Sequence, residues 1–232
     1  MSGISDLAQI GLYLFYVLLP ALAFYIAYLI ITKAFKDMGF SSIEAIIIVF
    51  VSFILGEGLI DKYVGFSFSN IRLSSQGYWT VGINVGGAII PIVLSIYLVI
   101  KNKLKLSRIF LGIIIVAIVT FFVTYPDPEK GIVSPFPYWL LPAVFASFAS
   151  VFLSWKNFRK AAPLAYVSGT IGVLIGADFL HLPELLSYPI STTKSAVIGG
   201  ADVFDMVFIT GLLAVIADGV LVYHKKSKER RP

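Results

Sequence analysis

Long apolar stretches separated by short polar segments make up most of the 232 residues of this chain. A hydrocarbon core about 30 Å thick is crossed by about 20 residues of α-helix, because each residue advances the helix by about 1.5 Å. Seven stretches approach this length, so the pattern predicts an all-α, polytopic integral membrane protein with seven transmembrane helices. The predicted spans are Leu7–Ile31, Ile43–Ile60, Trp79–Ile100, Leu106–Thr124, Tyr138–Trp155, Ala161–Leu180 and Asp202–Tyr223.

The composition agrees with a membrane protein. Hydrophobic residues make up 58% of the chain and charged residues 13%, about half the charged share of an ordinary soluble domain. The chain has no cysteine, which excludes a disulfide scaffold, a thiolate metal site and a cysteine nucleophile. The formal net charge of +5 does not indicate a nucleic acid partner, because the position of the positive residues explains it better.

The Lys and Arg residues fall in alternate loops, which predicts the orientation of the chain. Fourteen belong to one set of loops and four to the other, so we expect the amino terminus outside the cell membrane and the carboxyl terminus in the cytoplasm. Residues 1–223 then form one membrane domain, and residues 224–232 form a basic cytoplasmic tail attracted to anionic membrane lipid. The outer set is Lys62, Arg72, Lys130 and Lys194.

Two of the predicted outer segments are longer than simple turns. Residues 64–79 carry β-branched and aromatic residues around a polar centre at Ser69 and Asn70, which predicts a small hairpin. Residues 125–139 contain four prolines, so this segment cannot be helical and is expected to form a rigid, partly re-entrant loop.

Small residues recur at intervals of four in two of the predicted spans, and this spacing lets membrane helices approach closely. We therefore expect the third and sixth spans to pack against each other. The small residues are Gly82, Gly86 and Gly87 in the third span, and Ser168, Gly172 and Gly176 in the sixth. Asn84 lies among the first group, where an amide in lipid must find a partner. It is either an interhelical clamp or a ligand of a site.

Ionisable side chains are costly within a membrane span and are therefore functional candidates. Six of them lie at or near the outer ends of predicted helices: Glu57, Asp61, Asp178, His181, Asp202 and Asp205. Because residues three or four apart share a helix face, Asp178 and His181 are expected to be neighbours, as are Asp202 and Asp205. These residues predict a polar cluster in the outer half of the membrane. Asp218 lies toward the cytoplasmic end, where we expect it to pair with basic residues.

Three motifs carry a family resemblance: VGINVGGAIIPIVLSIYL, IGADFLHL and GGADVFDMVFITGLL. They resemble a family of prokaryotic membrane proteins catalogued as domain of unknown function sixteen-fourteen, over most of residues 79–215. The last motif of that family usually looks like GGAGTFD, and Gly199, Gly200, Phe204 and Asp205 match it. The resemblance implies a polytopic membrane fold and no particular activity.

A more distant likeness is to the intramembrane aspartyl proteases of the presenilin and signal peptide peptidase type. Those enzymes carry one Asp on a sixth helix and a second at the start of a seventh, and Asp178 and Asp205 occupy comparable places. No Gly-x-Gly precedes Asp205 and no Tyr precedes Asp178. The resemblance implies that these two aspartates are a catalytic pair.

The first functional hypothesis is an intramembrane aspartyl hydrolase, in which Asp178 and Asp205 are catalytic. Two carboxylates that share a site cannot both ionise easily, so one keeps a proton and the pair serves as acid and base. A transmembrane peptide would be the substrate, with no cofactor, and the outer hairpin would offer it a strand edge. The residues expected to bind this substrate are Asn84, Gly86, Gly87, Phe66 and Phe68.

Two other functions stay open. A cation- or proton-coupled transporter would use Glu57, His181 and Asp202 as ligands of a divalent cation, and as a small protein it would form a homo-oligomer. A non-catalytic membrane scaffold would use its acidic residues only for helix packing. The chain has no Gly-x-Ser-x-Gly elbow, HExxH helix or phosphate-binding Gly-rich loop.

Overall fold

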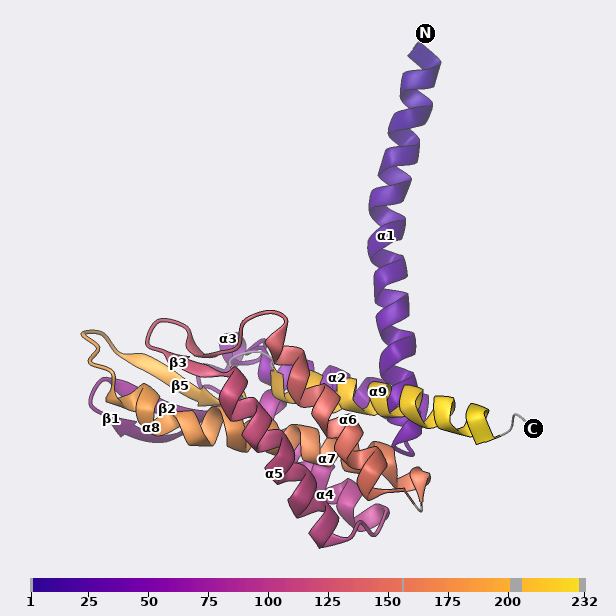
Figure 1. Cartoon of the computed structure of the whole chain (residues 1–232). Helices are drawn as coiled ribbons and strands as arrows, with labels where there is room; N and C mark the ends of the chain where they lie inside the picture. The colour runs from indigo at the N-terminus through magenta and orange to yellow at the C-terminus, as the bar shows by residue number, and fades with distance from the viewer. Residues whose placement is uncertain (1, 156, 201–205, 230–232) are drawn as a thin grey trace.

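The computed structural model describes residues 2–155, 157–200 and 206–229, and it is mostly helical (Figure 1). Three of its helices are long and apolar enough to cross a membrane: Phe15–Asp37, Leu106–Val123 and Phe158–Ser187. Four shorter apolar helices accompany them, at Ser42–Gly56, Val85–Lys101, Tyr138–Leu153 and Ile209–Gly219. These lengths and compositions are those of a polytopic membrane protein.

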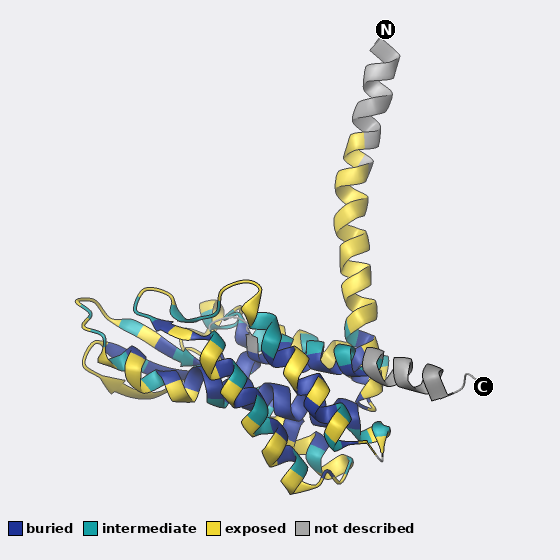
Figure 2. Cartoon of the chain, viewed as in Figure 1, coloured by how far each residue is buried: buried dark blue, intermediate teal, exposed yellow. Residues whose placement is uncertain are grey.

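The first two helices begin the chain and differ in their surroundings. Between Phe15 and Ile30, helix α1 (Ser2–Asp37) stands away from the other helices and its side chains are exposed (Figures 1 and 2). Near its end, Ala34 and Phe35 are buried, and this part of α1 packs against α2 and α9. Helix α2 (Ser42–Gly56) begins at a capping box, in which Ser41 and Glu44 bind each other's backbone N–H groups. The short helix α3 (Asp61–Val64) follows.

A three-stranded sheet lies at one end of the molecule, in the order β1-β2-β5. Strands β1 (Asn70–Gln76) and β2 (Trp79–Asn84) form an antiparallel hairpin, and β5 (Lys194–Ile198) pairs in parallel with β2. The predicted hairpin is therefore present, but it starts later than expected. Phe66 and Phe68 precede it, and Ser69 and Asn70 lie at its start.

The third predicted span was wrong at its amino-terminal end, because its first six residues form β2. Burial alternates at the start of this strand, because Trp79 and Val81 are buried and Thr80 between them is only partly buried. The helical part begins with the π-helix η1 (Val85–Ile89) and continues as α4 (Ile90–Lys101). Pro91 lies where η1 passes into α4, inside a helical path that runs from Val85 to Lys101, and it has no N–H to donate to the preceding turn.

The remaining helices form a bundle around α7 (Ala161–Val173), in which every residue except Ile171 is buried (Figure 2). Helix α5 (Leu106–Val123), α6 (Leu141–Leu153) and α9 (Met206–Glu229) pack around it. The helical path of α7 continues through the π-helix η4 (Leu174–Phe179) into α8 (Leu180–Ser187). Short 3-10 turns, η2 (Tyr138–Leu140) and η3 (Phe158–Lys160), precede α6 and α7.

The third and sixth spans pack against each other through α4 and α7, as predicted, but the small residues of α7 and η4 pack against α5. A Cβ added at Gly172 would lie 2.5 Å from Val116, and one added at Gly176 would lie 2.4 Å from the Ala117 carbonyl oxygen. Ser168 likewise contacts Gly112 of α5. The glycines of the third span contact other elements, because the strand at its start changes where they point.

The proline-rich segment is not helical, as predicted. It forms a two-stranded hairpin of β3 (Tyr125–Asp127) and β4 (Gly131–Val133) and then enters η2. This hairpin lies above the carboxyl ends of α5 and η4, beside β5 (Figure 1). The loop thus covers the end of the bundle at which the acidic candidates were expected.

Candidate functional site

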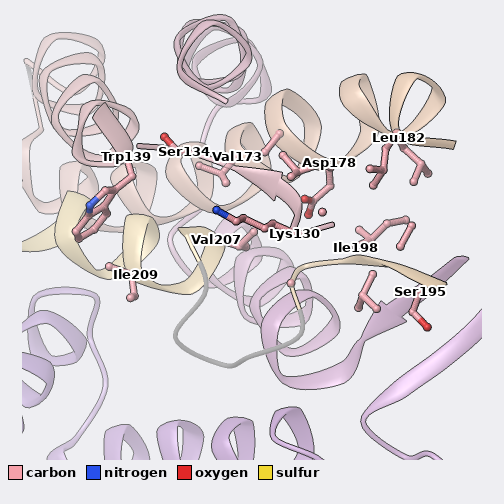
Figure 3. A pocket seen from close by; sticks show the side chains of 17 residues that line it. Lys130, Ser134, Trp139, Val173, Asp178, Leu182, Ser195, Ile198, Val207 and Ile209 are labelled. Carbon is pink, nitrogen blue, oxygen red and sulfur yellow. The ribbon is translucent and has the colours of Figure 1, made fainter. Parts of the chain in front are cut away.

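A cavity of about 530 Å³ lies at the end of the bundle between η4, α8, β5, the start of α9 and the β3–β4 hairpin. Figure 3 shows Asp178 and Lys130 at its centre and Trp139 at one end, with Leu182 and Ser195 at the other. The lining residues from the helices are Val173, Ala177, Asp178, Leu182, Leu185, Val207 and Ile209; the others are Lys130, Gly131, Ile132, Ser134, Trp139, Ser195, Ala196, Val197, Ile198 and Gly200.

One wall of the cavity is the free edge of β5. Successive residues of a strand point to opposite faces, yet all of Ser195–Ile198 line the cavity. The strand pairs with β2 along its other edge, and no described strand pairs with it on the cavity side. Backbone groups of β5 are therefore available to a ligand in an extended conformation.

Asp178 is the buried carboxylate of this cavity. It lies on the π-helical segment η4, is only 6% exposed, and accepts a 2.7 Å hydrogen bond from the backbone N–H of Gly199. Single π-helical turns are found often at functional sites because they redirect a side chain within a helix. The bond to Gly199 fixes Asp178 at the carboxyl end of β5.

The β3–β4 turn is held over β5 by ionic and hydrogen-bonded contacts. Lys194 binds the Glu129 carboxylate at 2.7 Å and the Pro128 carbonyl oxygen at 2.9 Å. Within the turn, Asp127 accepts hydrogen bonds from the N–H groups of Glu129 and Lys130, and these bonds lower the pKa of Asp127. The cavity is therefore roofed by a loop that is tied to its own strand wall.

Asp205 and Asp202 lie outside the described residues. The segment that contains them connects Gly200, which follows β5 and lines the cavity, to Met206, the first residue of α9. Val207 and Ile209 of α9 also line the cavity. Both flanks of the segment therefore belong to the cavity wall that carries Asp178.

The buried amide of Asn84 joins α2, β1 and η1. Its Nδ2 donates to the carbonyl oxygen of Gly56 at 3.1 Å and to Oδ1 of Asn70 at 3.0 Å. Its Oδ1 accepts from the N–H of Gly87 at 2.7 Å and so caps η1. Asn84 is thus an interelement clamp, one of the two roles that its sequence position allowed.

Gly86 and Gly87 permit close backbone packing and do not line the cavity. A Cβ at Gly86 would lie 2.2 Å from the Ser52 carbonyl oxygen of α2, and one at Gly87 would lie 2.1 Å from that of Gly199. The contact of Gly87 with Gly199 supports the strand end that holds Asp178. These two glycines therefore act on the site indirectly, by allowing η1 to pack closely against α2 and against the end of β5.

Phe66 and Phe68 lie in the loop before β1, away from the cavity lining. Their rings are exposed and their centroids are 4.2 Å apart. Asp61 organises this loop by accepting hydrogen bonds from the Ser67 hydroxyl and the N–H groups of Phe68 and Ser69. Partial burial opposes ionisation of Asp61, but these hydrogen bonds outweigh it and lower its pKa.

His181 and Glu57 are not brought together with Asp178 in the cavity lining. The His181 ring stacks on Phe121 of α5, with centroids 4.6 Å apart, and its Nε2 lies 3.2 Å from the Phe121 carbonyl oxygen. Glu57 caps the carboxyl end of α2. Among the described residues no three His, Asp or Glu side chains are placed to hold a metal ion.

Asp218 is buried in α9, and among the described residues its hydrogen-bond partner is Ser150 of α6, where a basic residue was expected. The Ser150 hydroxyl donates to its Oδ1 at 3.0 Å. The contact lies three turns along α9 from the cavity-lining residues Val207 and Ile209. Asp218 is therefore separate from the cavity of Asp178.

Lys130, Trp139 and the edge of β5 belong to the site but were not singled out in the sequence. The run Lys194–Ile198 contains β-branched residues directly before Gly199 and Gly200, which is a strand signal followed by a turn signal. Its significance depends on a partner strand more than 100 residues earlier in the chain. No local pattern reveals that pairing.

A family model described as a protein of unknown function (DUF1614) matches residues 58–217. The match includes the sheet, the cavity and the first half of α9, and it confirms the family resemblance of the three motifs. No curated protein and no solved structure matches the chain. None of these comparisons supports the likeness to presenilin-type proteases.

Proposed function

Because this chain belongs to the DUF1614 family of proteins of unknown function, we propose its activity from the cavity alone: it is an intramembrane aspartyl hydrolase that cleaves a membrane peptide. The observation that carries the proposal is a buried carboxylate beside an unpaired strand edge. Asp178 and Ser195–Ile198 line one cavity, and a peptide bond that is to be hydrolysed must be presented in an extended conformation.

The substrate peptide lies along the free edge of β5 in this proposal. Its backbone pairs with the strand, as in other cases of β-strand addition, while its side chains contact the apolar walls formed by Trp139, Leu182 and Leu185. The β3–β4 turn covers it from the outer side. Phe66 and Phe68 are exposed and lie outside the cavity lining. In this proposal they contact lipid, or the part of the substrate that lies outside the cavity.

Asp205 is the second carboxylate of the pair. Its place in the chain, between the cavity-lining residues Gly200 and Val207, supports this role. One carboxylate takes a proton from water as the water oxygen attacks the peptide carbonyl carbon. The other, protonated, gives its proton as the carbon–nitrogen bond breaks, so the products are a carboxylic acid and an amine.

The test uses the purified full chain reconstituted in liposomes with a mixed library of labelled transmembrane peptides, and mass spectrometry detects cleavage. We expect the wild type to cut peptides that contain an extended or helix-breaking segment. Asp178→Asn and Asp205→Asn should each lower the rate by at least about 10³-fold, because neither acid nor base acts alone.

Asp218→Asn is the matched control, since it neutralises a buried aspartate of α9 outside the cavity. It should cleave at a rate close to that of the wild type. Equal cleavage by the wild type and Asp178→Asn would rule out the hydrolase. Loss of cleavage in all three variants would indicate a general loss of folded structure, and melting temperatures measured in parallel identify that case.

Proton-coupled transport is a second candidate because, among the described residues, two carboxylates are buried, Asp178 in η4 and Asp218 in α9. Buried carboxylates of this kind are typical of proton relays in membrane transporters. A pH-sensitive dye inside the same liposomes would report proton flux. Proton flux in the wild type that is lost in both Asp178→Asn and Asp218→Asn, without peptide cleavage, would favour transport. If the wild type showed neither proton flux nor peptide cleavage, the scaffold hypothesis would be favoured.

The topology that accompanies the proposal has seven spans in the cell membrane, with the amino terminus outside. The four shorter apolar helices complete the three long ones, and the basic loops remain cytoplasmic. The exposed apolar surface of α1 is then covered by lipid or by a second copy in a homo-oligomer.

A further inference from the structure

A second, smaller cavity lies at the opposite end of α5 from Asp178. It measures about 170 Å³ and is lined by Leu104, Lys105, Arg108, Ser154, Asn157, Lys160 and Leu164. Three of these residues are cationic, and none of those in the described lining is acidic. We propose that this cavity binds a phosphate group, and that the group belongs to an anionic lipid headgroup at the cytoplasmic surface. The proposal is independent of the hydrolase.

The amino terminus of α5 and the turn before α7 meet at this cavity. Lys105 precedes α5, and no side chain caps the first N–H groups of that helix. Lys160 ends the turn η3, which runs directly into α7 and pairs the first N–H of α7 with the Phe158 carbonyl oxygen. The first turn of a helix carries partial positive charge and unpaired N–H donors. Lys105, Arg108 and Lys160 add positive charge beside the amino terminus of α5, and an anion bound there would neutralise part of this charge.

Ser154 provides an independent indication of a ligand. It lines the cavity, is 1% exposed, and its hydroxyl has no hydrogen-bond partner among the described residues. A buried hydroxyl without a partner costs free energy unless a ligand or water binds it. A phosphate oxygen in this cavity would accept its proton.

One of the cationic groups, the Lys160 ammonium, is held in place by a hydrogen bond within the protein. Lys160 donates from Nζ to the carbonyl oxygen of Lys103 at 2.9 Å, which joins the α6–α7 turn to the α4–α5 turn. Leu104 and Leu164 form a buried apolar floor. The volume of this cavity is about a third of the 530 Å³ of the Asp178 cavity, which suits a group the size of phosphate better than a large ligand.

The position of the cavity identifies the source of the phosphate. Helix α5 has 18 residues and is therefore about 27 Å long, close to the thickness of a hydrocarbon core. In the proposed topology its amino terminus lies at the level of the inner headgroups. Basic pockets between helices on the cytoplasmic side are typical sites for anionic lipid headgroups.

The experiment measures the melting temperature of the purified full chain in neutral detergent. One arm adds phosphatidylglycerol in mixed micelles, with zwitterionic phosphatidylcholine as the reference. The other arm adds inorganic phosphate, with chloride at the same ionic strength as the reference. We expect phosphatidylglycerol to raise the melting temperature in a saturable way. Saturation by inorganic phosphate as well would identify free phosphate as a second source.

Arg108→Gln should raise the half-saturating concentration of phosphatidylglycerol about tenfold or more, because a charged, planar donor is lost. Arg159→Gln removes one charge from the same turn but from a residue outside the cavity lining, so it should change the value less than about twofold. Ser154→Ala should weaken binding without changing the charge. Lys105→Gln, at an exposed position, replaces Arg108→Gln if that variant does not fold.

Two outcomes would overturn the proposal. The first is that neither phosphatidylglycerol nor phosphate raises the melting temperature beyond its reference. The second is that Arg159→Gln weakens the effect as much as Arg108→Gln does, which would mean that only the total charge of the loop matters, as in a purely topogenic role.

Discussion

The side chain of Asn84 joins three elements through hydrogen bonds that leave none of its amide groups exposed. The sequence indicates that such an amide needs a partner in lipid, but it does not indicate which partner. Asp178 is a similar case, because its partner is the backbone of Gly199, 21 residues away. For single residues, the residue type therefore indicates that a partner is needed, but the identity of the partner depends on the tertiary fold.

Asn84→Ala should lower the free energy of unfolding by about 2–4 kcal/mol, because it leaves buried donors and acceptors of Gly56, Asn70 and Gly87 without partners. Asn102→Ala is the control, since that amide binds only the Leu98 carbonyl oxygen at the end of α4. Denaturant unfolding in detergent measures both. Asn84→Ala with unchanged stability and altered activity would instead favour the ligand role.

At the scale of elements, the sequence predicts helices well wherever a long apolar stretch is bounded by polar residues. Predicted span Leu106–Thr124 corresponds to α5 within one residue at its end. The stretch after Trp79 fails because its strand and its helix are both apolar, so hydropathy cannot separate them. The stripe of small residues in α7 was recognised, but its partner α5 was not, because spacing identifies a packing face without identifying its neighbour.

Gly172→Ala should destabilise the bundle by about 1–3 kcal/mol, because the new Cβ would lie 2.5 Å from that of Val116. Val116→Ala alone leaves a cavity and is also destabilising. The double variant should be less destabilised than the sum of the two, since truncating Val116 removes the Cγ1 atom that would lie 2.7 Å from the new methyl group, while the contact with Cβ stays.

Gly169→Ala controls for the general effect of alanine on a helix. Its nearest neighbour, the Gly211 Cα, would lie at an ordinary contact distance of 3.4 Å, so little destabilisation is expected. Additive effects of Gly172→Ala and Val116→Ala in denaturant unfolding would contradict the contact between α5 and α7.

At the scale of the whole molecule, the two ends of the bundle differ in charge and in the cavity that each contains. The cavity of Asp178 lies with the sheet and the β3–β4 hairpin, whereas the basic cavity lies where α5 and α7 begin (Figure 1). The position of every Lys and Arg is visible in the sequence, so this polarity was predictable. The sheet between residues 70 and 198 was not, because it depends on pairing between distant segments.

The natural absence of cysteine allows a direct test of orientation. Single cysteines placed at Thr192, an exposed residue before β5, and at Lys103, in the exposed α4–α5 turn, should react differently with a membrane-impermeant maleimide. We expect Thr192→Cys to be modified in intact cells and Lys103→Cys only after permeabilisation. The reverse result would invert the topology, and modification of both in intact cells would reduce the number of spans.

The parallel pairing of β2 with β5 also affects how the protein is made. Trp79 pairs with Lys194, so β2 leaves the ribosome with one edge unpaired until more than 100 further residues have been synthesised. During that interval the unpaired edge is a template for pairing with other extended chains. Nascent chains that stop before residue 194 should therefore aggregate or be degraded, because the wall beside Asp178 is completed only near the end of synthesis.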